Sequence, residues 1–317
     1  MTGVQTCALP IFRKELLHWR FLDSWKGCLP WKSECYIQLR MYSDASHSGW
    51  GGCLVIPGQS PSEARGFWDV ESRALPIAVK ESLALLRALE SLAGRVHNAR
   101  IDAFVDNKVL LASWENQLSR SQAISDVLKS LFEFSYARNL HLSLVYVPSK
   151  ENPADGPSRV VSDLDCTLSP VAWQRVDSAF GPHTLDLMAI PCNVKCDRSG
   201  HPLRFFSPYP CPQAAGTNVF AQNIPPDENA FVFPPFVLIG PLVKFLSSQG
   251  CSFSIVVPDL RPRKFWWPLV ERSASSAFKL GSKGDPSILL FPARSGPSVW
   301  SPRPLQWDIW VFRIPGA

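Results

Sequence analysis

Residues 36–160 contain a series of predicted elements whose order leaves few folds open. Short apolar or alternating segments bounded by glycine and proline turns predict three consecutive strands, followed by a helix, a strand, two helices, a strand and a last helical turn. The predicted strands are 36–44, 52–56, 64–68, 101–105 and 141–147, and the helical segments are 76–94, 107–114, 122–137 and 152–158. This order predicts an α/β domain of about 125 residues with a mixed five-stranded sheet.

The chain changes character near residue 160. Of its 29 prolines, 8 precede residue 160 and 21 follow it. Residues 161–179 are expected to be a linker. A predicted strand, helix and strand between 230 and 257 form a β-α-β unit, so residues 180–271 are expected to be a second, smaller α/β domain. Residues 272–317 are expected to be a basic tail rich in tryptophan and proline.

Residues 1–35 precede these domains. The opening MTGVQTCALPIF has no basic region before its apolar stretch, so it does not fit a secretory signal. It resembles translated sequencing-adapter DNA, and residues 1–12 are therefore expected to be an artefact. Residues 13–35 are expected to be a short helix and turn that connect to a longer upstream chain.

Composition excludes some classes of protein. The 317 residues are 46% apolar and 19% charged, with no run of 18 apolar residues, so two buried cores are expected and a membrane span is not. Nine cysteines without the spacing of a secreted domain favour free thiols and an intracellular location, in the cytoplasm or nucleus. The net charge of +5 permits a nucleic-acid partner without requiring one.

Four acidic residues of the first domain lie where isolated acids are hard to explain. Asp44 and Asp106 each end a predicted strand, and Asp155 lies in the last helical turn. Glu81 is in line with Leu85 on the apolar stripe of its helix, at about 100° per residue. A carboxylate on a face that packs against a sheet is costly unless a cation neutralises it.

Divalent cations would reconcile these carboxylates. Acids that are brought together raise one another's pKa, whereas Mg²⁺ prefers hard oxygen ligands, and two such ions can assist the in-line displacement of a phosphodiester. Each acid taken singly could instead be a helix cap or a solvated turn residue. Together they predict a site for two Mg²⁺ ions made of Asp44, Glu81, Asp106 and Asp155.

These motifs resemble the Asp-Glu-Asp-Asp core of the ribonuclease H family. They are YSDASHSGWGG, PIAVKESLAL, FVDNKVLL and ENPADGPSR, in that order. Residues 36–160 are similar to the ribonuclease H domain of DIRS-type, gypsy-related retrotransposon reverse transcriptases, and residues 13–35 to the connection that precedes it. The resemblance implies Mg²⁺-dependent hydrolysis of the RNA strand of RNA–DNA hybrids, with the reverse transcriptase upstream in the same polyprotein.

Two features leave alternatives open. Cellular ribonucleases H have a histidine in the loop before the last aspartate, and the corresponding loop at 147–150 has none, which implies slower proton transfer or product release, or a role for water. Gly49, Gly51 and Gly52 either let the chain approach substrate closely or form an ordinary hairpin. An inactive module that binds hybrid or braces a polymerase is the alternative to an active nuclease.

Residues 180–271 carry a weaker resemblance, to phage-type DNA N6-adenine methyltransferases. It rests on GPHTLDLMA around Asp186 and on FVFPPF at 231–236. The resemblance implies that Asp186 helps to hold S-adenosylmethionine and that a flipped adenine stacks in the loop formed by Pro234, Pro235 and Phe236. Because Phe233 replaces the polar residue of that loop, a degenerate domain is expected, with S-adenosylmethionine unbound; an active adenine methyltransferase is the alternative.

Two more patterns have competing interpretations. Four residues could be zinc ligands, but their spacing fits no compact zinc motif and buried thiols are expected instead: Cys192, Cys196, His201 and Cys211. Aromatic and basic residues near the C-terminus could contact nucleic acid, or the tryptophans could pack in a core: Trp266, Trp267, Trp300, Trp307 and Trp310, beside Arg261, Arg263, Lys264, Arg272 and Arg303.

Overall fold

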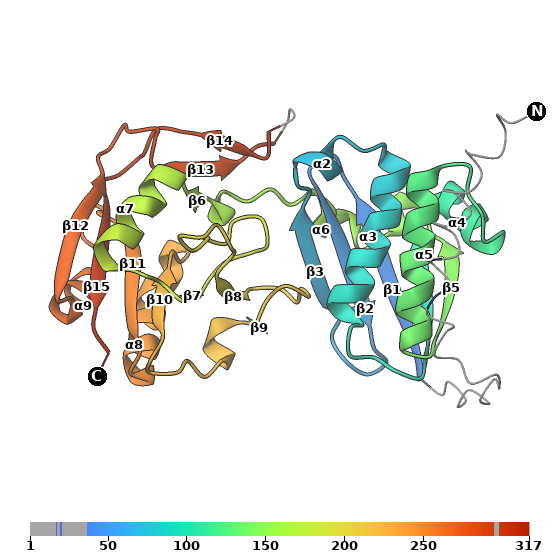
Figure 1. The fold of residues 1–317 in the computed structure, drawn as a ribbon, viewed down its shortest axis with the longest axis horizontal. Coiled ribbons are helices and arrows are strands. Elements are labelled where there is room, and N and C mark those ends of the chain that lie inside the picture. The colour runs from blue at the N-terminus through green and yellow to red at the C-terminus, as the bar shows by residue number, and fades with distance from the viewer. Residues whose placement is uncertain (1–16, 18–19, 21–36, 295–297, 317) are drawn as a thin grey trace, which may run out of the picture.

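The computed structural model describes residues 17, 20, 37–294 and 298–316, which form two α/β domains side by side (Figure 1). The predictions for residues 1–12 and for almost all of 13–35 lie outside the described residues. None of the described helices is long and apolar enough to span a membrane.

The first domain is built on the expected mixed five-stranded sheet. Its strand order is β3-β2-β1-β4-β5. β1, β2 and β3 form an antiparallel meander, and β4 and β5 run parallel to β1. The strands are β1 (Ile37–Ala45), β2 (Gly49–Val55), β3 (Ser62–Phe67), β4 (Ala99–Val105) and β5 (Leu140–Tyr146).

Helices cover both faces of this sheet. α3 and α5 pack on one face (Figure 1), where apolar side chains such as Leu85 and Leu131 are fully buried with Met41 and Ile101 of the strands. The short α6 packs against β1, β2 and β3 on the other face. The helices are α2 (Val70–Arg73), α3 (Ile77–Leu92), α4 (Lys108–Glu115), α5 (Gln122–Ala137) and α6 (Asp155–Arg159), with a 3-10 turn at Ser149–Glu151.

The second domain contains a seven-stranded sheet in the order β12-β15-β11-β10-β7-β8-β9. β15 runs antiparallel to both of its neighbours, and the central strands are parallel. The expected β-α-β unit is β10, α8 (Ile239–Gln249) and β11. The strands are β7 (Leu185–Asp186), β8 (Arg204–Ser207), β9 (Gly216–Thr217), β10 (Asn229–Val232), β11 (Ser252–Pro258), β12 (Ser276–Gly281) and β15 (Ile309–Ile314).

The flanking segments differ from the sequence-based expectation. α7 (Pro170–Phe180) lies inside the expected linker, and its Ala172 and Val176 are fully buried in the second domain. The expected tail supplies β12 and β15, because apolar residues that alternate along β15 fill both faces of the sheet. The remaining elements are β6 (Thr167–Leu168), β13 (Leu289–Pro292) and β14 (Trp300–Pro302), which form a three-stranded sheet, α9 (Trp267–Ser273), and 3-10 turns at Asp163–Asp165, Val219–Ala221 and Phe236–Leu238.

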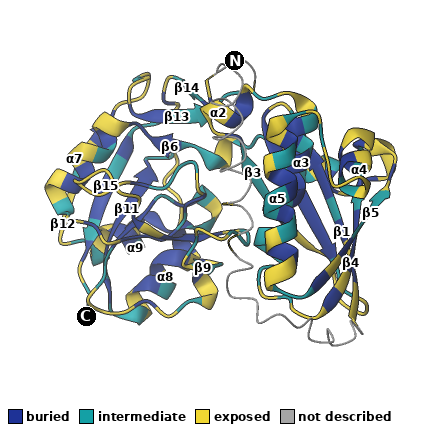
Figure 2. Ribbon diagram, turned by 45° about the vertical axis from the view of Figure 1, so that its right-hand side comes forward, coloured by how far each residue is buried: buried dark blue, intermediate teal, exposed yellow. Residues whose placement is uncertain are grey.

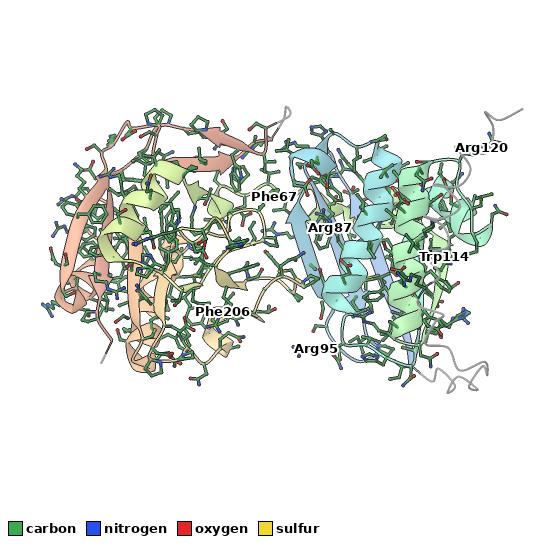
Figure 3. All side chains as sticks on the ribbon, in the orientation of Figure 1. Phe67, Arg87, Arg95, Trp114, Arg120 and Phe206 are labelled. Atoms are coloured by element: carbon green, nitrogen blue, oxygen red, sulfur yellow. The ribbon has the colours of Figure 1, made fainter. Side chains whose placement is uncertain are left out.

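Each domain has its own buried core (Figure 2). Polar contacts join the domains beside β3, where Phe67 and Arg87 also lie (Figure 3). Arg65 forms a 3.8 Å ion pair with Asp165 and lies over the ring of Tyr209. These contacts cover part of the β3 edge strand with the second domain.

Candidate functional site

Four separate elements position the carboxylates of the first domain. Asp44 lies near the end of β1 and is 4% exposed, and Asp106 directly follows β4. β1 and β4 are parallel neighbours, so their carboxyl ends meet at one edge of the sheet. Glu81 is in the second turn of α3, and Asp155 is the first residue of α6.

The charges of these carboxylates influence one another. Burial raises the pKa of Asp44, and the charges of Asp106 and Asp155 raise it further, against a hydrogen bond from Ser158 that lowers it. Burial raises the pKa of Glu81 to about 7, again with contributions from Asp106 and Asp44. The structure therefore brings the four acids into one shared electrostatic field.

Three polar residues that the sequence analysis missed hold these acids. The Ser158 hydroxyl donates to Asp44 Oδ2 at 2.5 Å, and the Ser149 hydroxyl donates to Asp106 Oδ2 at 2.5 Å. Arg159 donates to Asp155 Oδ1 at 2.7 Å. Two of the three follow Asp155 by three and four residues, a helical spacing that could have identified them from the sequence.

Arg159 interacts electrostatically with three of these acids. Its pKa is raised first by the hydrogen bond to Asp155 and by the charge of that carboxylate, and then by the charges of Asp44 and Asp106. One guanidinium therefore interacts with three of the four acids. It supplies positive charge to a place where carboxylates would otherwise repel one another.

The donor set fits a hard divalent cation. Carboxylate oxygens are the ligands that Mg²⁺ prefers, and Glu81 has no hydrogen bond or ion pair with any described residue. As the side chains stand, no three histidine, cysteine or acidic side chains in the described ranges are grouped closely enough to hold one ion. The residues that would hold Mg²⁺ are Asp44, Glu81, Asp106 and Asp155, with Ser149, Ser158 and Arg159 as their present partners.

Two glycines of β2 make room for helices. A Cβ on Gly51 would lie 2.6 Å from the backbone nitrogen of Ser158, and a Cβ on Gly52 would lie 2.5 Å from the Cβ of Ala88 in α3. Gly51 therefore allows α6 to sit directly on β2, beside Asp44. Both glycines thus allow helices to pack on β2. The sequence analysis expected instead either a close approach to substrate or an ordinary hairpin.

The loop before α6 is fixed to the same place. Asn152 is 5% exposed, and its side-chain amide donates to the carbonyl oxygen of Ser43 at 2.9 Å. Its side-chain oxygen accepts from the backbone N–H of Ala154 at 3.0 Å. The residue next to Asp44 is thus tied to the residue before Asp155, which sets the separation of those two carboxylates.

In the second domain, a cavity of about 360 Å³ lies at the carboxyl end of β10. Pro234, Pro235 and Phe236 line it, together with Phe233 and Trp307. The rings of Phe236 and Trp307 meet edge to face, with their centroids 5.5 Å apart. Aromatic side chains therefore form part of the cavity wall, and Phe233 gives its loop an apolar side chain.

Asp186 is not among the residues that line this cavity. It is 3% exposed and accepts hydrogen bonds from the backbone N–H groups of Lys195 and Met188. Burial raises the pKa of Asp186 to about 6, although the Lys195 ammonium lowers it. An acid enclosed by its own chain does not fit the S-adenosylmethionine role that the resemblance implies.

The cysteine-rich segment gives no metal site among the described residues. Cys192, Cys196 and Cys211 are free, and the side chain of His201 is 80% exposed. No three side chains of the right type are grouped there. Burial raises the pKa of the Cys192 thiol to about 12, which keeps it protonated.

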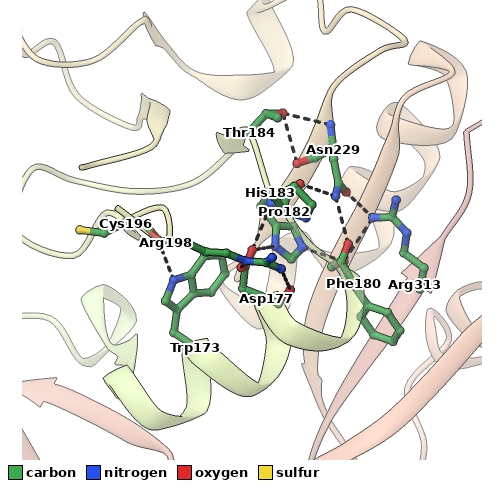
Figure 4. Close-up of polar contacts among 11 residues, drawn as sticks. Trp173, Asp177, Phe180, Pro182, His183, Thr184, Cys196, Arg198, Asn229 and Arg313 are labelled. Carbon is green, nitrogen blue, oxygen red and sulfur yellow. Dashed lines mark hydrogen bonds and ion pairs between the residues drawn. The ribbon is translucent and has the colours of Figure 1, made fainter. Parts of the chain in front are cut away.

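A buried polar network connects α7 to the sheet of the second domain (Figure 4). His183 contacts Asp177 Oδ1 at 2.9 Å and Ser254 Oγ at 3.0 Å. The three residue types are those of a hydrolytic triad, but Ser254 is fully buried and His183 is 4% exposed. No substrate can reach this serine, so the network stabilises the domain.

The sequence matches no protein-family model and no curated protein. Solved structures similar to the chain include ribonuclease H1 from Halobacterium salinarum (16% identity, TM-score 0.32, 38% of this chain and 92% of that one). Others are LC11 ribonuclease H1 from compost, in complex with an RNA/DNA hybrid (16%, 0.33, 38% and 92%), and the N-terminal ribonuclease H domain of a Mycobacterium tuberculosis protein (12%, 0.30, 38% and 90%). By its own sheet order and helix placement, the first domain has a ribonuclease H-like α/β fold.

Proposed function

We propose that residues 36–160 are a Mg²⁺-dependent endonuclease that hydrolyses the RNA strand of RNA–DNA hybrids, downstream of a reverse transcriptase in a retrotransposon polyprotein. The observation that carries the proposal is the mutual influence of Asp44, Glu81, Asp106 and Asp155, which come from four separate elements. A half-buried group of acids with one guanidinium beside it suits cation binding better than a purely structural role.

The residues of the proposed site have different roles. Mg²⁺, when bound, supplies an activated water and neutralises charge on the reacting phosphate. Ser158 and Ser149 orient the carboxylates of Asp44 and Asp106. Glu81, with a pKa near 7, is the carboxylate with the most to gain from a bound cation.

A basic depression next to Glu81 supports binding of a phosphate backbone. His47, Arg73 and Lys80 line it. Arg73 is 5% exposed and its Nε has no hydrogen-bond partner, and no acidic side chain lines the depression. Because Arg73 and Lys80 are buried, they would attract a phosphate through their charge and not through direct contact, and the shape and 2′-hydroxyls of a hybrid would supply the discrimination between RNA and DNA.

The test is single-turnover cleavage of a hybrid with a labelled RNA strand in Mg²⁺. We expect the wild-type chain to cut the RNA strand only, and Asp106→Asn to abolish cutting. Asp102→Asn is the matched control, since Asp102 lies four residues earlier, within β4, and its carboxylate is bound by Gln38 and Arg100. Cleavage that survives Asp106→Asn, or an inactive wild type, would favour the alternative of an inactive binding module.

For the second domain we propose a degenerate methyltransferase-like fold that transfers no methyl group. Its support is the parallel β-α-β core with an aromatic cavity at the carboxyl end of β10, where ligands bind in open α/β sheets. The enclosure of Asp186 argues against a cofactor. We expect no methyl transfer to DNA, even from a Phe233→Asn variant; transfer by either chain would favour an active methyltransferase.

A further inference from the structure

The loop between β11 and α9 exposes an aromatic ring among cations. Phe265 is 79% exposed, and nearby Val237 is 82% exposed. By contrast, Trp266 and Trp267, which follow in the chain, are each 3% exposed and belong to the core. A large apolar side chain that stays mostly exposed to solvent, next to two that are buried, is an exception to the usual burial of aromatic residues and indicates a binding surface.

The Phe265 ring packs closely against a glycine. A Cβ on Gly240, in the first turn of α8, would lie 2.8 Å from Cε2 and 3.0 Å from Cζ of this ring. The ring edge therefore packs against the helix backbone while most of the ring stays in solvent. Val237 lies in the 3-10 turn that directly precedes α8, three residues before Gly240.

Cations flank the ring in the chain, and one of them, Arg263, pairs with Asp259 and Glu271 at 3.8 Å each and lies over the ring of Trp267. Residues 259–272 contain four cations and two acids, a net charge of +2. Arg261 pairs with Asp259 at 2.7 Å but its side chain remains 68% exposed. Lys264, directly before Phe265, is exposed and has no ion pair with any residue in the described ranges.

The aromatic cavity of this domain begins beside the same surface. Phe236, which lines the cavity, is the neighbour of Val237 in the chain. The Phe265 ring thus packs on the first turn of α8, and the turn that precedes α8 lines the aromatic cavity. Cations that track a backbone, with aromatic faces at the same level, are the features of surfaces that bind single-stranded nucleic acids.

We propose that Phe265, Lys264, Arg261, Arg263 and Val237 form a binding surface for single-stranded nucleic acid on the second domain. An unpaired base stacks on Phe265, and the cations contact the flanking phosphates. The strand must be unpaired because stacking on a protruding ring requires a free base face. This site is separate from the carboxylate site and does not depend on hydrolysis.

The test is fluorescence anisotropy of a labelled 20-nucleotide oligothymidylate with the full chain in EDTA, which prevents metal-dependent cleavage. We expect Phe265→Ala and Phe265→Leu to weaken binding about fivefold or more, and Phe265→Trp to preserve it. Phe265→Leu keeps an apolar contact with Gly240, so it separates stacking from folding. Val171→Ala, at another exposed apolar side chain of this domain, is the control.

Charge is tested by the salt dependence of the same binding. Lys264→Gln should reduce the slope of log K against log salt by about 0.7, the value for one phosphate contact to a single strand. Lys283→Gln, at an exposed lysine elsewhere in the domain, should leave the slope unchanged. Equal affinity of Phe265→Ala and Val171→Ala, or binding to phosphatidylserine vesicles without binding to the oligonucleotide, overturns the proposal.

Discussion

Gly51→Ala should distort the proposed nuclease site although it replaces none of the four carboxylates. The new Cβ would lie 2.6 Å from Ser158 N and 2.7 Å from Ala154 O, both backbone atoms of α6 or its cap. Ordinary contact begins at 3.4 Å, so α6 must move away from β2 by about 0.8 Å to relieve the shorter contact. This movement displaces Asp155 and Ser158 together relative to Asp44, because both lie on α6.

The magnitude follows from that displacement. Overpacking of this kind costs about 1–3 kcal/mol in the free energy of unfolding. Misplacement of catalytic groups by nearly 1 Å costs about 100-fold in rate, so cleavage of hybrid should fall by about that factor. The assays are urea unfolding followed by hydrogen exchange in peptides from residues 37–160, and single-turnover cleavage.

Gly156→Ala is the matched control for this prediction. Gly156 lies in α6 itself, and apart from its chain neighbours and the backbone of its own helix nothing lies within 4 Å of a Cβ placed there. The substitution should leave cleavage within a few-fold of wild type. If Gly51→Ala and Gly156→Ala gave the same stability and the same cleavage rate, the packing of α6 on β2 would not position the site.

Three further predictions concern buried polar groups. Ser158→Ala removes the donor to the buried Asp44 carboxylate and should lower the free energy of unfolding of the first domain by about 1–3 kcal/mol, measured in urea at pH 7. Burial holds the pKa of His183 below its ordinary 6.5, so just below pH 6.5 the unfolded chain binds a proton that the folded chain does not. The free energy of unfolding therefore falls as the pH drops below about 6.5. His183→Gln should flatten that part of the pH dependence relative to wild type. Lys195→Met removes the buried ammonium that donates to the carbonyl oxygen of Leu168 and lowers the pKa of Asp186, and it should cost about 1–3 kcal/mol in urea unfolding, part of which a second change, Asp186→Leu, should recover.

The order of elements and the four acids could be predicted because each depends on local pattern. The strand alternation around Asp44 and the apolar stripe that includes Glu81 and Leu85 can both be read from the sequence. They predict the order of strands and helices that the mixed sheet contains. The residues that hold the acids were harder to find. Ser149 and Asp106 are 43 residues apart and meet only after β4, β5 and the 3-10 turn have folded together.

The boundaries of the second domain escaped prediction for a similar reason. Proline content suggested a linker before residue 180, but Pro170 occupies the first turn of α7, where proline is compatible with a helix. The C-terminal strand β15 inserts between β11 and β12, so its partners are far away in the sequence. Asp186 matched a motif, yet its enclosure by Lys195 depends on the path of an irregular loop.

The most direct test of the carboxylate site is Mn²⁺ binding followed by electron paramagnetic resonance, with Mn²⁺ in place of Mg²⁺. If the proposed site forms, we expect two magnetically coupled ions per chain. Glu81→Gln should remove the coupling, while Glu90→Gln, at a half-buried glutamate of the same helix, should retain it. Uncoupled ions, or coupling that persists in Glu81→Gln, would contradict the account of four carboxylates that form one two-ion site.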